Sequence, residues 1–176
     1  MLTYAEAEFT LASIFKADSK AQVGAFRGRL KHLKRLGIPL GSNPGRGKKI
    51  GYQRNELYQW LFCLELEEFG IDPSIIVKIV RRYWLEWFGP GFEAVAKDNP
   101  DAEETLFCFA PQLMSAGWRP EQEFRGIGPP FGFRGRNGLK DLIDQIGEGD
   151  CRISLFIVSR RVRQIEEAFH AKENQR

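Results

Sequence analysis

The sequence predicts a mainly α-helical N-terminal domain followed by a small α+β C-terminal domain. Four segments between residues 3 and 87 carry apolar residues at helical spacing, bounded by capping and turn residues. The Gly89-Pro90-Gly91 sequence interrupts this pattern. Beyond it, short runs of aromatic and β-branched residues alternate with a Gly- and Pro-rich segment and two helical patterns. We therefore expect domains at residues 1–88 and 89–176.

Composition is that of a soluble globular protein. Of 176 residues, 43% are hydrophobic and 28% are charged, and no segment approaches the length of an apolar membrane span. The N-terminus lacks the layout of a signal peptide. Three widely spaced cysteines and two histidines indicate neither a disulfide framework nor a metal site. We expect a cytoplasmic, nucleoid-associated protein without membrane contact, metal or cofactor.

The first two predicted helices cover residues 3–16 and 20–36. Ser19 with Gln22 forms a capping-box pattern at the start of the second helix, and Gly37 followed by Pro39 ends it. A helix, a short turn and a basic helix are the layout of a helix-turn-helix.

Positive charge is concentrated between residues 20 and 54. This stretch has no Asp or Glu, whereas the rest of the chain has 16 basic and 23 acidic residues. Such segregation favours binding to a polyanion. The alternative is a solvated, charge-rich surface. The ten basic residues are Lys20, Arg27, Arg29, Lys31, Lys34, Arg35, Arg46, Lys48, Lys49 and Arg54.

The second helix has two different sides. Its apolar side should pack on the first helix and consists of Val23, Phe26, Leu30 and Leu33. The opposite side consists of Gly24, Gly28, Lys31 and Arg35, flanked by Arg27 and Lys34. The two glycines either allow close approach to a DNA groove or are merely tolerated on the surface. We expect Arg29, on a lateral side of this helix, to be a phosphate contact or a solvated residue.

Residues 41–52 (GSNPGRGKKIGY) combine turn-forming residues with three cations. They predict a hairpin or wing with a basic tip. A phosphate-binding P-loop is excluded because Ser42 and Lys49 occupy positions that need Gly and Ser or Thr.

Two further helices follow, from residue 55 to about residue 69 and from residue 73 to about residue 87. We expect the first to have one apolar side that includes Leu57, Trp60 and Leu61. Asp72 and Pro73 fit the start of the second, whose wide apolar surface indicates packing between the two halves of the chain or a dimer interface.

The order of features from Leu30 to Val80 is characteristic. A basic helix ends at Gly37-Ile38-Pro39 and is followed by the glycine-bearing wing, then by Tyr52, Glu56-Leu57 and Trp60, and then by Leu66, Gly70-Ile71-Asp72-Pro73 and Ile76. This run resembles the DNA-binding domain of the mercury-resistance-regulator (MerR) family. The resemblance implies a winged helix-turn-helix at residues 3–88. Ile50 stands where that family usually has Arg.

The C-terminal segments predict a small α+β unit. We expect a strand or strand pair at residues 104–115, a long irregular loop at 117–138, a short helix at 137–146, a strand at 152–158 and a helix from 159 to about 171. The loop interleaves arginines with aromatic residues, which either bind nucleic acid or form cation–π pairs that anchor the loop.

We therefore expect a sequence-specific transcriptional regulator that binds double-stranded DNA as a homodimer. Residues 20–36 would enter the major groove and residues 43–50 would contact the backbone. The C-terminal unit would dimerise, sense an effector, or contact RNA polymerase or another protein. The expected DNA contacts are Lys20, Gln22, Gly24, Arg27, Gly28, Lys31, Lys34, Arg35, Arg46, Lys48, Lys49, Tyr52 and Arg54.

Two other functions are compatible with the sequence to different degrees. The same domain could serve an excisionase-like or architectural factor that bends DNA during recombination. An enzyme is disfavoured, because the sequence contains no recognisable nucleophile–base pair, metal cluster or phosphate loop.

Overall fold

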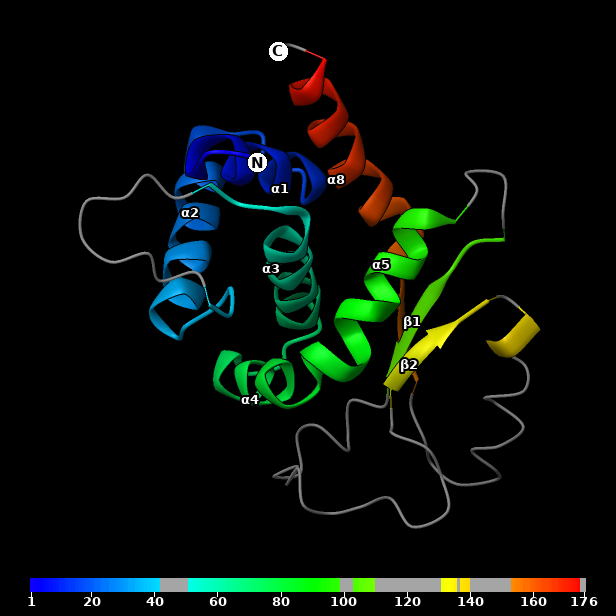
Figure 1. Cartoon of the computed structure of the whole chain (residues 1–176). Helices are drawn as coiled ribbons and strands as arrows, with labels where there is room; N and C mark the ends of the chain where they lie inside the picture. Colours follow the sequence, from blue (N-terminus) through cyan, green and yellow to red (C-terminus); the bar gives the residue numbers. More distant parts are fainter. Residues whose placement is uncertain (42–50, 99–102, 110–130, 136, 140–152, 175–176) are drawn as a thin grey trace.

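The computed structural model describes residues 1–41, 51–98, 103–109, 131–135, 137–139 and 153–174. These residues form a mainly helical fold with a small three-stranded antiparallel sheet (Figure 1), which confirms the mainly α character expected from the sequence. In chain order the elements are α1 (Tyr4–Ile14), α2 (Lys20–Arg35), α3 (Arg54–Glu68), α4 (Pro73–Tyr83), the π-helix η1 (Trp84–Phe88), α5 (Gly89–Lys97), β1 (Leu106–Phe109), β2 (Phe131–Arg134), β3 (Ser154–Ile157) and α8 (Val158–Glu173).

Local sequence signals set the ends of the N-terminal helices. Thr3 and Ser19 cap α1 and α2 through complete capping boxes, and Asp72 caps α4 by accepting a hydrogen bond from the Ser74 amide. Gly37 follows the end of α2 with a φ of 87°, a conformation that favours glycine. The predicted capping box at Ser19 and the end of the basic helix before Gly37 are both confirmed.

Helix α3 lies at the centre of the molecule. Every residue from Leu57 to Leu66 is buried, and α1, α2, α4, α5 and α8 all pack against this helix (Figure 1). The sequence predicted one apolar side, but the helix is buried all round and even contains Gln59 and Glu65 in the core. Gln59 accepts a hydrogen bond from the Leu40 amide at 2.7 Å, which satisfies part of its amide group.

The two predicted domains share one hydrophobic core. Phe62 of α3 lies 4.6 Å from the ring of Phe88 and 5.0 Å from that of Phe107, centroid to centroid. One cluster of buried residues extends from Leu2 to Phe169. Helical structure also passes through Gly89-Pro90-Gly91, where the sequence predicted a boundary, because Pro90 lies in the first turn of α5 and needs no amide partner there.

The sheet has the order β2-β1-β3, with both neighbours antiparallel to the central strand. Strand β2 was not expected, since residues 131–134 lie inside the segment predicted to be an irregular loop. Gly91 of α5 allows the Phe133 ring of β2 to pack closely against α5, because a Cβ at this position would lie 2.2 Å from that ring. Strand β3 and helix α8 agree with the predicted strand and helix near the C-terminus. Residues 110–115 and 140–146 of the other predicted elements lie outside the described residues.

Ion pairs attach α8 to the N-terminal helices. The Arg161 Nε atom lies 2.9 Å from Oε1 of the buried Glu65, and the same guanidinium donates to the carbonyl of Ile14 at 2.6 Å. Arg54 pairs with Glu166 and Glu173, and Lys172 pairs with Glu6. The last helix of the chain is therefore fixed against α1 and α3.

Replacing Arg161 tests this attachment. Burial raises the pKa of Glu65 even with Arg161 beside it, so removing Arg161 leaves an unpaired carboxylate in the core. We expect Arg161→Gln to lower the free energy of unfolding by about 3 kcal/mol. This value is at the lower end of the cost of breaking a buried ion pair, because Arg161 is partly exposed.

The matched control is Arg160→Gln. The Arg160 side chain is 64% exposed, so its pair with Glu104 should be worth less than about 1 kcal/mol. Because the pKa of Glu65 is raised in the folded protein, its ionisation lowers the free energy of unfolding as the pH rises. The stability difference between the wild type and Arg161→Gln should therefore become smaller at lower pH. Urea unfolding at several pH values measures both effects. Equal losses in the two variants, or a deficit that grows in acid, would contradict the buried-pair account.

Candidate nucleic-acid interface

Packing against the core determines which side of α2 faces outward. Phe26, Leu30 and Leu33 are buried, and Val23 is partly buried beside them. The Phe26 ring lies 5.7 Å from that of Phe15, just beyond the end of α1. The predicted apolar side of α2 is therefore confirmed, and the opposite side of the helix points away from the core.

That opposite side carries three exposed cations. Lys20, Lys31 and Arg35 are exposed. Within the described part of the chain, no hydrogen bond or ion pair joins any of these three side chains to another residue. Gly24 and Gly28 lie between them on the same side of the helix, and both are exposed. We call the surface formed by these five residues the α2 basic face.

Three other cations of the basic stretch are paired with acids from other helices. Arg27 pairs with Glu8 of α1 at 2.7 Å, and this carboxylate raises the pKa of Arg27. Arg29 pairs with Glu67 at 2.8 Å and with Glu68, both at the end of α3. Arg29 is therefore not the solvated residue that was one of the two expectations, because this half-buried side chain serves the packing of α2 on α3, and its contact with a phosphate stays a prediction.

Arg54 is the third paired cation, and it faces α8. Its guanidinium contacts Glu166 at 2.7 Å and Glu173 at 3.2 Å, and lies 4.6 Å from the centre of the Phe169 ring. Tyr58 donates a second hydrogen bond to Glu166. Arg54 was expected to contact DNA, but the structure does not bring it to the α2 basic face.

Tyr52 also differs from its expected position on the surface. It is 1% exposed, its ring lies 4.8 Å from that of Trp60, and its backbone pairs with Leu2. Its hydroxyl group accepts a hydrogen bond from Lys34 at 3.3 Å. Tyr52 is therefore a core residue that positions an exposed lysine.

The remaining expected contacts divide into two groups. Gln22 is exposed and completes the capping box of Ser19, so its side-chain oxygen accepts a hydrogen bond from the Ser19 amide. Arg46, Lys48 and Lys49, the cations of the predicted wing, lie outside the described residues. The charge count of the sequence located the basic stretch, but only the fold separates its paired cations from its unpaired ones.

Nothing in the described part of the molecule requires Gly24 or Gly28. A Cβ added at either position would meet no described atom within 4 Å outside its own turn of helix. Glycine in a helix costs about 0.5–1 kcal/mol relative to alanine. The packing of the described residues gives no compensation for this cost, so either an external partner or tolerance at the surface explains the two glycines.

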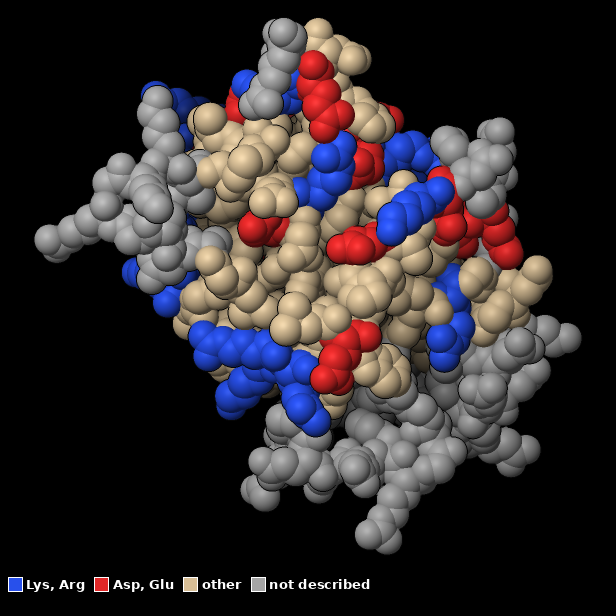
Figure 2. Space-filling view, in the orientation of Figure 1, with Lys and Arg blue, Asp and Glu red and all other residues tan. Residues whose placement is uncertain are grey.

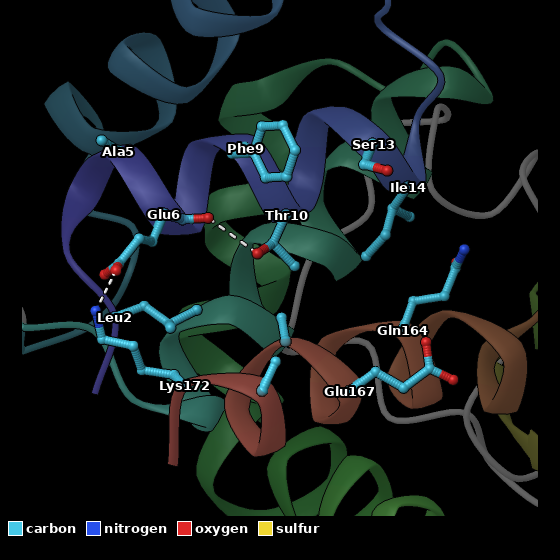
Figure 3. Close-up of a pocket in the computed structure, with 12 residues that line it drawn as sticks. Leu2, Ala5, Glu6, Phe9, Thr10, Ser13, Ile14, Gln164, Glu167 and Lys172 are labelled. Carbon is cyan, nitrogen blue, oxygen red and sulfur yellow. Dashed lines mark hydrogen bonds and ion pairs between the residues drawn. The ribbon is translucent and has the colours of Figure 1, made fainter. Parts of the chain in front are cut away.

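One hollow of the molecule lies between α1 and α8, away from the α2 basic face. The groove between α1 and α8 has a volume of about 550 Å³. Figure 3 shows Phe9 beside it and the pair of Glu6 and Lys172 at one end. The Thr10 hydroxyl in this groove donates to the Glu6 carbonyl. Among the described residues, no group of three His, Cys, Asp or Glu side chains could hold a metal ion.

The two described cysteines do not have the properties of nucleophiles. Burial raises the pKa of both Cys63 and Cys108, which disfavours the reactive thiolate. Cys63 is fully buried in α3.

No protein-family model matches this chain, and no curated protein matches it either. No helix within the described ranges is long and apolar enough to cross a membrane.

The two glycines give a direct stability test. Because an added methyl group would enter open space, Gly24→Ala and Gly28→Ala should each raise the free energy of unfolding by about 0.5–1 kcal/mol. Urea unfolding followed by circular dichroism measures the change. A loss of stability in either variant would show that packing, and not an external partner or surface tolerance, requires the glycine.

Proposed function

We propose that this protein is a sequence-specific DNA-binding transcriptional regulator that reads duplex DNA with α2. The observation that carries the proposal is the α2 basic face. Its three exposed cations have no partner, and its two glycines have no packing role, among the residues that the structure describes. In this proposal α1 and α2 act as a helix-turn-helix, and residues 43–50 act as the wing of a MerR-like domain.

The dimensions of α2 suit the major groove. Its 16 residues span about 24 Å, and a helix with its side chains is about as wide as the groove. Glycine at positions 24 and 28 removes side chains from the outward surface, so the backbone can lie close to base edges. Lys31 and Arg35, one and two turns further along, then reach bases or phosphates.

Charge supplies the affinity in this proposal. Lys20, Lys31 and Arg35 have no carboxylate to displace within the described residues, so each can neutralise a phosphate without first breaking an ion pair. Each neutralised phosphate releases counterions, which makes binding dependent on salt. The ion pair of Arg27 with Glu8 makes that residue a weaker candidate, although its side chain is 52% exposed.

The proposal includes a homodimer on an inverted repeat. A pair of recognition helices related by a two-fold axis would lie about 34 Å apart, one turn of the duplex. In this arrangement the C-terminal residues join two copies, sense an effector, or contact RNA polymerase or another protein.

Salt dependence of binding tests the proposal. DNA selected by the protein from a random duplex library is titrated by fluorescence anisotropy at increasing NaCl concentrations. We expect log Kd to rise with log salt with a slope of about 0.9 per phosphate neutralised, hence a slope of several units. A slope near zero, or failure to select any sequence, would contradict sequence-specific DNA binding.

Variants of the α2 basic face separate its role from that of exposed charge in general. Lys31→Gln and Arg35→Gln should weaken binding and also reduce the preference for the selected sequence, each by about 1–3 kcal/mol if the side chain reads a base. Lys97→Gln is the control, since Lys97 is also exposed but lies on α5. Gly24→Ala and Gly28→Ala should weaken DNA binding while stabilising the fold. Unchanged binding in all four variants would exclude α2 as the reading helix.

A further inference from the structure

Helix α4 carries a second group of exposed cations that no described carboxylate neutralises. Ile76, Val77, Ile79 and Val80 form its buried side, whereas Lys78, Arg81 and Arg82 are exposed. No ion pair joins these three cations to an acid within the described ranges. Glu86 follows Arg82 by one turn but makes no ion pair with it. We call the surface of Lys78, Arg81 and Arg82 the α4 basic patch.

The α4 basic patch is held at the C-terminal end of α2. Nη2 of Arg81 donates a hydrogen bond of 2.8 Å to the carbonyl of Leu36, the residue that caps α2. A Cβ on Gly37 would lie 3.0 Å from the same nitrogen, so the missing side chain leaves room for the guanidinium. A cation at this position is also favoured by the partial negative charge of the helix end. The bond places α4 next to Arg35, the last residue of α2.

Exposed cations therefore lie on both sides of the Arg81–Leu36 bond. Figure 2 shows Lys and Arg atoms gathered over α4 and near the adjoining end of α2. Arg54 of α3 and Arg161 and Lys172 of α8 differ, since carboxylates neutralise all three. Unpaired positive charge thus extends from the α2 basic face across the Arg81–Leu36 bond to the α4 basic patch.

We propose that the α4 basic patch binds backbone phosphates of the same DNA duplex that α2 enters, beyond the C-terminal end of α2. The proposal rests on the function proposed above and extends the interface to an element outside the basic stretch of the sequence. Lys78 and Arg82 contact phosphates directly. Arg81 is a positioning residue, because its bond to Leu36 fixes α4 relative to the reading helix. Contacts of this kind set orientation and affinity but carry no sequence information.

Another anionic surface has to be distinguished from DNA. Leu85 is 81% exposed and Trp87 is 49% exposed, and both follow the α4 basic patch in η1. Cations beside exposed apolar side chains also suit a membrane of acidic lipids. The continuity of the α4 basic patch with the α2 basic face favours DNA, and binding to lipid vesicles is therefore one outcome of the test.

The test compares Lys78→Gln and Arg82→Gln with Lys97→Gln, which removes the same charge from an exposed site on α5. Each full-length variant is titrated with the selected duplex and with an unrelated duplex over a range of NaCl concentrations. We expect the two α4 variants to lose affinity several-fold for both duplexes alike and to reduce the salt slope by about one unit each. Lys97→Gln should match the wild type.

Failure of this inference is distinguishable from failure of the proposed function. One outcome is that the wild type binds duplex DNA and Lys31→Gln weakens this binding, while both α4 variants behave like Lys97→Gln. That outcome excludes only the phosphate-binding role of the α4 basic patch. If the α4 variants change sequence preference, the patch reads bases and the backbone assignment is wrong. Loss of binding to phosphatidylserine vesicles with unchanged DNA binding would assign the patch to membranes. Wild-type protein that binds no duplex overturns both proposals.

Discussion

The burial of α3 on every side is the constraint on which the structure depends. Ten consecutive residues of this helix are inaccessible to solvent, so a neighbour must cover each of its faces. Helix α2 covers one of these faces through Phe26, Leu30 and Leu33, which leaves the α2 basic face directed outward. The one acidic group deep in α3, Glu65, recruits Arg161 and thereby fixes α8. The same central helix holds together the core and the proposed DNA-binding surface.

Charge in this protein is divided between two uses. Arg29, Arg54 and Arg161 connect helices through carboxylates that are themselves largely buried, and in these partly buried sites their ion pairs are less screened than on the open surface. Lys20, Lys31, Arg35 and the α4 basic patch have no such partners among the described residues. A guanidinium committed to an internal carboxylate contributes little to binding a phosphate, so the unpaired residues define the candidate interface better than the total charge does.

The sequence predicted the features that local signals determine, and it missed those that depend on distant contacts. The capping box at Ser19, the end of α2 before Gly37 and the apolar side of α2 follow from residues close in the chain. The partner of Arg54 lies 112 residues away at Glu166, and no nearby residue indicates it. Tyr52 is buried because Leu2, Tyr4 and Trp60 meet around it. Strand β2 needs β1 to pair with, and its Gly- and Pro-rich flanks indicated a loop. The charge count does not reveal the α4 basic patch, because Lys78, Arg81 and Arg82 lie outside the stretch without acids. The signal for them is their helical spacing on the side opposite Ile76 and Ile79.

The most direct measurement is a lysine footprint of the DNA complex. The protein is acetylated briefly with and without the selected duplex, and modification at each lysine is measured by mass spectrometry. The account predicts strong protection of the exposed Lys20 and Lys31 in the complex and equal modification of Lys97 in both samples. Equal modification of Lys20 and Lys31 with and without DNA, while the duplex is fully bound, would contradict the claim that α2 is the DNA-reading surface.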